Sequence, residues 1–178
     1  GNSIVFPALR TTLNAMLILG IDPGLRITGY GLVSLTAGRP LLQEAGVLRM
    51  KSKGDLAERL GEVHQSLAEL VGESAPDRVA VEQLYAHYKH PWTAILMGHA
   101  RGVILLAAAQ RGIPVTNQAS TPVKRTITGN GHASKGQVQR AVAMLCRLPR
   151  PPEPPDVADA IAIAWTLATR IGHHSRPK

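Results

Sequence analysis

The chain has 178 residues, of which 44% are hydrophobic, and it carries a formal net charge of +8 at neutral pH. This length suits one domain with a real hydrophobic core and excludes a second full domain. The excess of positive charge indicates an acidic partner, most commonly nucleic acid, although charge alone excludes neither a ribosomal nor a membrane-surface role.

The first predicted elements are strands. Residues 1–15 are expected to be an N-terminal extension or an expression remnant, because the first strand candidate, "MLILGI", begins at Met16. Two further strands are predicted over 28–35 and 40–50, separated by the turn-like "TAGR". Since short connections favour antiparallel neighbours, we expect the domain to open with a meander.

Helices and strands alternate in the next part of the chain. Apolar residues at helical spacing predict an amphipathic helix over 55–71, and "DRVAVEQ" predicts a buried strand over 77–83. A long helix over 93–110 and a strand over 113–118 follow.

The last predicted elements are two helices. One runs from about Lys135 to Leu148, and the proline-rich segment 149–156 cannot continue it. The final helix begins at the end of that spacer, and residues 173–178 form a basic tail. A meander followed by alternating helices and strands predicts an α/β fold, with a mixed, mostly five-stranded sheet flanked by helices in a single domain over 16–172.

Cellular context is inferred from what the sequence lacks. No run is expected to span a membrane, because the most apolar window, 103–109, has His99 and Arg101 before it and Arg111 after it. The first residues lack the basic n-region of a secretory signal. The single Cys146 excludes an internal disulfide and is interpreted as a small buried hydrophobe. We therefore expect a cytoplasmic protein with no membrane partner.

Acidic residues are absent from a long stretch of the chain. From Gln83 to Pro152 there is no Asp or Glu, so a polyanion could lie across this half with little repulsion. The basic residues of the same stretch are Lys89, Arg101, Arg111, Lys124, Arg125, Lys135, Arg140, Arg147 and Arg150.

The segment "LYAHYKHPW" combines aromatic and basic side chains. Tyr85, Tyr88 and Trp92 surround Lys89, an arrangement that suits base stacking together with phosphate contact. Alternatively, one or two of these rings simply close the entry to the following helix.

Two carboxylates follow apolar strands directly. Asp22 comes directly after "LILGI" and is followed by Pro23 and Gly24. One interpretation of this pattern is a simple turn, and the other is a metal ligand at the end of a buried strand. Glu82 ends "VAV" in the same way.

A second pair of carboxylates lies in the final helix. Asp156 and Asp159 stand three residues apart and share one face of its first turn. Asp156 could act only as a helix cap, but Asp159 lies among apolar residues, where an unpaired carboxylate is costly. Four gathered carboxylates would repel one another, and magnesium or manganese would neutralise them. Two such ions about 4 Å apart can activate water and steady the leaving oxygen in phosphodiester cleavage.

Five segments carry a resemblance to a known family. "GIDPGLRITGYG", "VAVEQLY", "GHARG", "TPVKRTITGNGHASKGQVQ" and "PPDVADAIAIA", in this order and spacing, resemble the RuvC family of Holliday junction resolvases. The resemblance runs from Met16 to about Ala168.

This resemblance implies an RNase H-like fold and a magnesium-dependent crossover junction endodeoxyribonuclease. It implies paired incisions at four-way DNA junctions during recombination and repair, a homodimer and a branch-migration helicase partner. It assigns the catalytic, metal-binding role to Asp22, Glu82, Asp156 and Asp159, with two Mg²⁺ ions per site that Mn²⁺ can replace.

The resemblance also implies DNA-binding residues. Tyr85 corresponds to a ring that enters the junction and stacks on a base, although phenylalanine is more usual at that position. Lys124 and Lys135 match basic positions near the scissile phosphate. Arg101 matches by motif, with a helix-packing salt link as the alternative, and Lys89 and Arg125 complete the expected set.

Two other function classes are considered. A non-cleaving module could bind branched DNA, but such a module would gain from losing carboxylates beside phosphates. An actin-like or sugar-kinase-like ATPase also begins with an aspartate-glycine turn after its first strand, but it needs two lobes of this type, and the length of the chain argues against it.

Overall fold

A computed structural model describes residues 4–5, 15–24, 26–49, 54–84 and 91–174. Its sheet has six strands in the order β1-β4-β3-β2-β5-β6. The strands are β1 (Ile4–Val5), β2 (Met16–Asp22), β3 (Ile27–Thr36), β4 (Arg39–Arg49), β5 (Arg78–Glu82) and β6 (Val115–Gln118). The predicted five-stranded sheet is confirmed as β2 to β6, and β1 adds a two-residue strand that pairs with β4 from within the N-terminal segment.

The sheet is mixed, as the sequence predicts. β3 pairs antiparallel with both β2 and β4, which forms the expected meander. β5 lies parallel to β2, and β6 lies parallel to β5. These parallel pairs require crossovers, which the helices provide.

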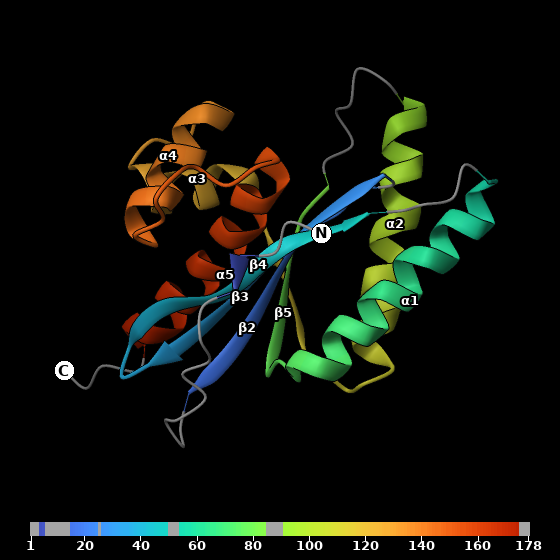
Figure 1. Cartoon of the computed structure of the whole chain (residues 1–178), viewed down its shortest axis with the longest axis horizontal. Helices are drawn as coiled ribbons and strands as arrows, with labels where there is room; N and C mark the ends of the chain where they lie inside the picture. Colours follow the sequence, from blue (N-terminus) through green and yellow to red (C-terminus); the bar gives the residue numbers. More distant parts are fainter. Residues whose placement is uncertain (1–3, 6–14, 25, 50–53, 85–90, 175–178) are drawn as a thin grey trace.

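Helices cover both faces of this sheet (Figure 1). α1 and α2 lie on one face, and α5 lies on the other with α3 and α4 beside it (Figure 1). The helices are α1 (Leu56–Ser74), α2 (Pro91–Ala109), α3 (Ser120–Thr128), α4 (Lys135–Leu145) and α5 (Pro155–His174). The sequence pattern does not predict α3, and the helix predicted over 55–71 ends three residues before α1 does.

Strand alternation divides the apolar side chains between two cores. In β2, Leu19 and Ile21 pack toward α1 and α2, whereas Ile18 packs toward α5. In β5, Val79 and Val81 face α1 and α2, and Ala80 faces α5. Because successive side chains of a strand point to opposite faces, Asp22 and Glu82 belong to the α5 side of the sheet.

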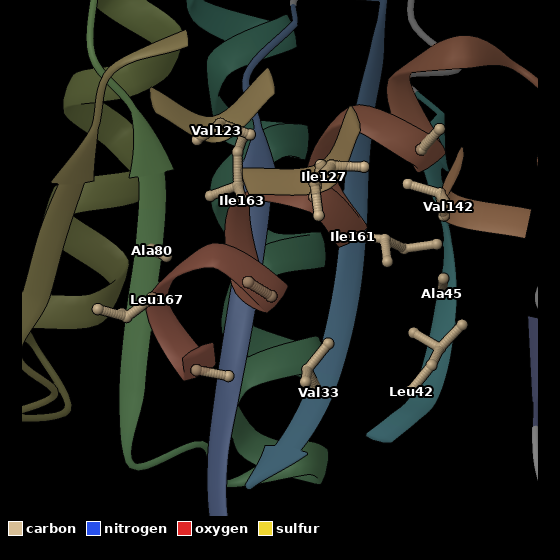
Figure 2. Packing of buried hydrophobic residues seen from close by; sticks show 14 of the residues in the cluster. Val33, Leu42, Ala45, Ala80, Val123, Ile127, Val142, Ile161, Ile163 and Leu167 are labelled. Atoms are coloured by element: carbon tan, nitrogen blue, oxygen red, sulfur yellow. The ribbon is translucent and has the colours of Figure 1, made fainter. Parts of the chain in front are cut away.

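The core on the α5 side is built around the inner face of that helix. Figure 2 shows Ile161, Ile163 and Leu167 of α5 with Val33 of β3 and Ala80 of β5. Side chains of α3 and α4 complete the cluster, so these short helices pack on α5 and carry their polar residues toward its first turn.

Glycines allow α5 to lie directly on the strands. Gly20 and Gly31 are paired across β2 and β3, and Gly29 is paired with Asp22. A Cβ at Gly29 would meet the carbonyl oxygen of Asp156, and one at Gly31 would lie 2.8 Å from the Cα of Ile161. These glycines therefore set the height of α5 above the sheet.

α2 differs from the sequence expectation about membrane spans. Within the described residues, α2 is the one helix that is long and apolar enough to cross a membrane by length and composition. The expectation that His99 and Arg101 would interrupt such a run was too strict. Ile104, Ala107 and Ala108 of this helix nevertheless pack in the core that it shares with α1, and Ala100 is also buried.

Cys146 occupies the environment that the sequence predicts. The residue is half-buried against the α5 core, and it follows the last residue of α4. Burial raises the pKa of its thiol to about 12. The thiol therefore stays protonated at neutral pH and behaves as a packing group.

Candidate active site

Two carboxylates lie at the ends of neighbouring parallel strands. Asp22 is the last residue of β2, and Glu82 is the last residue of β5. The ladder between these strands ends at the pair Ile21 and Val81, one residue before each carboxylate. The side chains of Asp22 and Glu82 therefore lie at the same edge of the sheet and on the same face.

The first turn of α5 brings the other two carboxylates to this edge. The helix begins at Pro155, whose fixed φ suits the first helical position, and Asp156 lies in its first turn. Asp156 and Asp159 line one pocket together with Asp22 and Glu82. The pocket has a volume of about 260 Å³.

Two lysines contribute positive charge to the same pocket. Lys124 belongs to α3 and Lys135 is the first residue of α4. The ammonium Nζ of Lys135 lies 4.0 Å from Oδ2 of Asp159, and its side chain is 69% exposed. Because this pair is open to solvent, its contribution to stability is small, and the ammonium can reach an external anion.

Asp22 is the most strongly perturbed of these carboxyl groups. The pKa of Asp22 is raised to about 8, mainly by burial and in addition by the negative charges of Glu82, Asp159 and Asp156. Lys135 acts in the opposite direction. Without a cation the Asp22 carboxyl is therefore largely protonated at neutral pH.

In Glu82 and Asp159, as in Asp22, burial and nearby lysines shift the pKa in opposite directions. Burial raises the pKa of Glu82, and the charge of Asp159 adds to this effect. Lys124, Lys135 and a side-chain hydrogen bond from Ser120 lower it. Burial also raises the pKa of Asp159, while Lys135 opposes that rise.

The donor set fits a hard divalent cation. All four groups are carboxylates, which are the ligands that magnesium and manganese prefer. Their concentration of buried negative charge is costly in the absence of a cation, as the raised pKa values show. Within the described residues, however, no group of three His, Cys, Asp or Glu side chains already has the arrangement of a metal site. The pocket gathers the four carboxylates without pre-forming the coordination of a metal ion.

The predicted DNA-binding residues lie in different places relative to the pocket. Lys124 and Lys135 line the pocket, and Arg125 is exposed on α3. Arg101 donates hydrogen bonds to the Glu82 carbonyl oxygen and to Asn117. Tyr85 and Lys89 lie outside the described residues, as does Tyr88.

Trp92, the third ring of the aromatic segment, lies in the first turn of α2. Its side chain is 69% exposed. The alternative that this ring closes the entry to the helix therefore does not apply to Trp92.

One polar residue of the pocket was not predicted from the sequence. Ser120 lines the pocket as the first residue of α3 and hydrogen-bonds the Glu82 carboxylate. Its only sequence signal is its position two residues after the predicted strand 113–118. Since α3 itself was not predicted, that signal could not be used.

Comparison with known proteins gives a consistent match across the chain. The family model described as crossover junction endodeoxyribonuclease RuvC matches residues 18–167. The chain is similar to the crossover junction endodeoxyribonuclease RuvC of Rhodopirellula baltica, with 53% identity over 151 residues and 85% of each chain covered. It is also similar to that of Moorella thermoacetica, with 45% identity over 163 residues, 92% of this chain and 97% of the relative.

Solved structures give the same result. The fold is similar to Thermus thermophilus RuvC in complex with a Holliday junction substrate, with a TM-score of 0.81 and 33% identity over 90% of this chain and 97% of that one. It is also similar to the yeast mitochondrial Holliday junction resolvase Ydc2, with a TM-score of 0.61 over 89% of this chain and 82% of that one. The identity to the yeast protein is 13%, so that likeness shows the fold alone.

Proposed function

The chain belongs to the RuvC family of crossover junction endodeoxyribonucleases and is a Holliday junction resolving endonuclease, and we propose that Asp22, Glu82, Asp156 and Asp159 form its catalytic centre. The observation that carries this proposal is the convergence of four carboxylates, from β2, β5 and α5, on one pocket bordered by two lysines.

Magnesium is the proposed cofactor, with manganese able to substitute and two ions per site. Asp22, Glu82 and Asp159 would hold the ions, while Asp156 would complete the site or orient the attacking water. When bound, the metal would supply an activated water and stabilise the leaving oxygen of the phosphodiester. The carboxylates of this chain would then ionise, because the cation offsets the repulsion and burial that raise their pKa values.

The proposed DNA path follows the acid-free half of the chain. Lys124 and Lys135 belong to the pocket and would contact the phosphate to be cut and its neighbours, while Arg125 would extend the positive surface along α3. Tyr85 is proposed to stack on a junction base, with Lys89 at an adjacent phosphate. Both of these residues lie outside the described part of the chain, so their roles stand on the sequence alone.

A homodimer is proposed through the outer face of α2. Trp92, Ile95 and Leu106 fall on one face at helical spacing, and their exposed fractions are 69%, 50% and 51%. Gly102 lies on the same face, and a Cβ there would meet nothing within 4 Å in this chain. A second α2 could approach closely at that glycine, and two-fold symmetry would supply two sites for two coordinated cuts.

Two further proposals concern the cellular setting. A branch-migration helicase is the proposed partner of the complex on DNA, and the cytoplasm is the proposed location. Both follow from the family that the chain belongs to.

The two other function classes are not favoured. A binding-only module has no use for four carboxylates beside phosphates, and an ATPase of the actin type requires a second lobe, whereas the family model covers residues 18–167 of this chain.

A cleavage assay tests the proposed function. A synthetic four-way junction and a plain duplex of the same sequence are incubated with the protein, with no ion, with magnesium or with manganese. We expect symmetric cuts in the junction with either ion and none in the duplex. Junction binding without products under every ion condition would support the binding-only alternative instead.

A further inference from the structure

Arg101 joins three elements at the point where Glu82 leaves the sheet. It lies on α2, and its Nε donates a hydrogen bond to the carbonyl oxygen of Glu82 at 3.2 Å. Its Nη2 donates a hydrogen bond to Oδ1 of Asn117. One half-buried side chain therefore connects α2 to the end of β5 and to β6.

These contacts differ from those of a charge partner or a free DNA-binding side chain. The acceptor on Glu82 is the main-chain carbonyl, and Arg101 makes no ion pair with a described carboxylate. The guanidinium is a planar group that can donate in two directions at once, which suits the bridging of two strands. The helix-packing salt link considered from the sequence is thus replaced by hydrogen bonds from Arg101 to two uncharged acceptors.

The position of the bridge matters because Glu82 is paired with a neighbouring strand on one side only. Its ladder with β2 ends one residue earlier, at Val81. On the other side Glu82 pairs with Gln118, and the amide of Gln83 donates to the Gln118 carbonyl at 2.9 Å. Arg101 adds a third restraint, from the helix layer, to the residue whose carboxylate must face Asp22.

We infer that Arg101 is a positioning residue that fixes the Glu82 backbone so that its carboxylate stays in the pocket with Asp22. The inference rests on the proposed catalytic role of Glu82. It assigns Arg101 to the organisation of the site and not to the DNA path. Since small displacements of reacting groups cost up to about 100-fold in rate, loss of the bridge should slow cleavage without weakening junction binding.

The test compares three variants at two arginines with the wild type. Arg101→Ala removes the bridge, and Arg101→Lys keeps the charge but cannot reach both acceptors in the same plane. Arg111→Ala is the matched control, because Arg111 lies two residues after the end of α2 and donates a hydrogen bond at 3.0 Å to the main-chain carbonyl oxygen of Ala68 on α1. All three are measured for single-turnover cleavage with magnesium, for junction affinity against salt in EDTA, and for hydrogen exchange at the Gln83 amide.

For Arg101→Ala we expect a roughly 10- to 100-fold lower cleavage rate, faster exchange of the Gln83 amide, and a junction affinity within about twofold of the wild type. Arg101→Lys should recover part of the rate, and Arg111→Ala should match the wild type in all three measurements. Asn117→Ala removes one arm of the bridge without changing charge and should show a smaller loss in the same direction. It also serves as the test if Arg101→Ala does not fold.

Results that overturn the role of Arg101 can be distinguished from results that overturn the proposed function. A weaker junction affinity with a salt slope lowered by about one, and an unchanged rate at saturation, would make Arg101 a phosphate contact and overturn the inference. Equal losses in Arg101→Ala and Arg111→Ala would also overturn it. A wild-type protein that does not cut junctions would instead refute the proposed function.

Discussion

At the scale of single residues, Asp22 shows how burial and neighbouring charge act together. In the metal-free protein the pKa of Asp22 rises from 3.8 to about 8, first because the group is buried and then because Glu82, Asp159 and Asp156 are near. Between these two pH values the folded chain keeps a proton that the unfolded chain has lost. The folded state then binds more protons than the unfolded state, so the free energy of unfolding falls as pH rises through this window.

Asp22→Asn should therefore stabilise the metal-free protein in a pH-dependent way. The variant keeps a neutral side chain of similar size, so at pH 4 its free energy of unfolding should equal that of the wild type. At pH 8 the variant should be more stable by roughly 2 to 4 kcal/mol, which is less than the full shift at about 1.4 kcal/mol per pKa unit because the open pocket admits water. Urea unfolding in EDTA at both pH values measures the difference.

The same comparison with magnesium provides the control. A bound cation should stabilise the wild type at pH 8 and should stabilise Asp22→Asn much less, since the variant lacks one ligand. Parallel pH curves for the two proteins in EDTA would show that Asp22 is not a buried, repelled carboxylate.

At the scale of elements, the contact between α5 and the β2–β3 pair sets the geometry of the site. Gly29 is paired with Asp22 across the strands, and it lies under the main chain of Asp156. The glycine thus fixes one carboxylate of α5 relative to the carboxylate of β2. Gly20 and Gly31 make the same contact further along the helix.

Gly29→Ala should lift the first turn of α5 and disturb the site. Its Cβ would meet backbone atoms of Asp156, which cannot move aside as a flexible side chain would. We expect a loss of about 1 to 3 kcal/mol in unfolding free energy and a loss of cleavage of at least about tenfold. Thermal unfolding and single-turnover cleavage measure both effects.

Gly61→Ala is the matched control for this substitution. Gly61 lies in α1, and a Cβ there would meet nothing within 4 Å, so alanine should stabilise the helix by about 0.5 to 1 kcal/mol and leave cleavage unchanged. If Gly29→Ala behaved like Gly61→Ala, the close seating of α5 would not matter for the site.

The sequence predicts the strands of the sheet and the carboxylates at their ends because both follow from local patterns. Continuous apolar runs predict the buried strands that Asp22 and Glu82 follow, and helical spacing gives the shared face of Asp156 and Asp159, whereas the face of Asp22 and Glu82 comes from the structure. In contrast, α3 has a weak local signal. Its sequence "STPVKRTIT" contains a proline and three threonines, and it buries only Val123 and Ile127.

The contacts of Glu82 that the sequence does not predict depend on tertiary packing. Ser120 reaches Glu82 only because α3 packs against α4 and α5, and Arg101 reaches the Glu82 carbonyl and Asn117 only because the fold brings this part of α2 to the ends of β5 and β6. Neither pairing has a periodicity or a motif of its own. Such partners become visible only when the elements are assembled.

At the scale of the whole molecule, α2 leaves an apolar stripe uncovered, and we expect a second copy of the chain to cover it. Sedimentation of the wild type should give twice the 19.0 kDa mass of one chain. Leu106→Glu places a charge within that contact and should give a monomer, because a buried unpaired charge is costly.

Leu145→Glu is the control for the dimer. Leu145 is also an exposed leucine, but it ends α4 on the other side of the sheet, so the charge there should leave the dimer intact. A wild type that sediments as one chain at micromolar concentration would contradict the assignment of α2.

The central claim is that carboxylates from distant parts of the chain act together on a divalent ion beside DNA. The most direct measurement is single-turnover cleavage of a four-way junction by Asp22→Asn with magnesium, alongside its junction affinity in EDTA. We predict cleavage lowered at least about 1000-fold, with affinity equal to or tighter than that of the wild type because a negative charge is removed. Cleavage by Asp22→Asn at the wild-type rate would contradict the account.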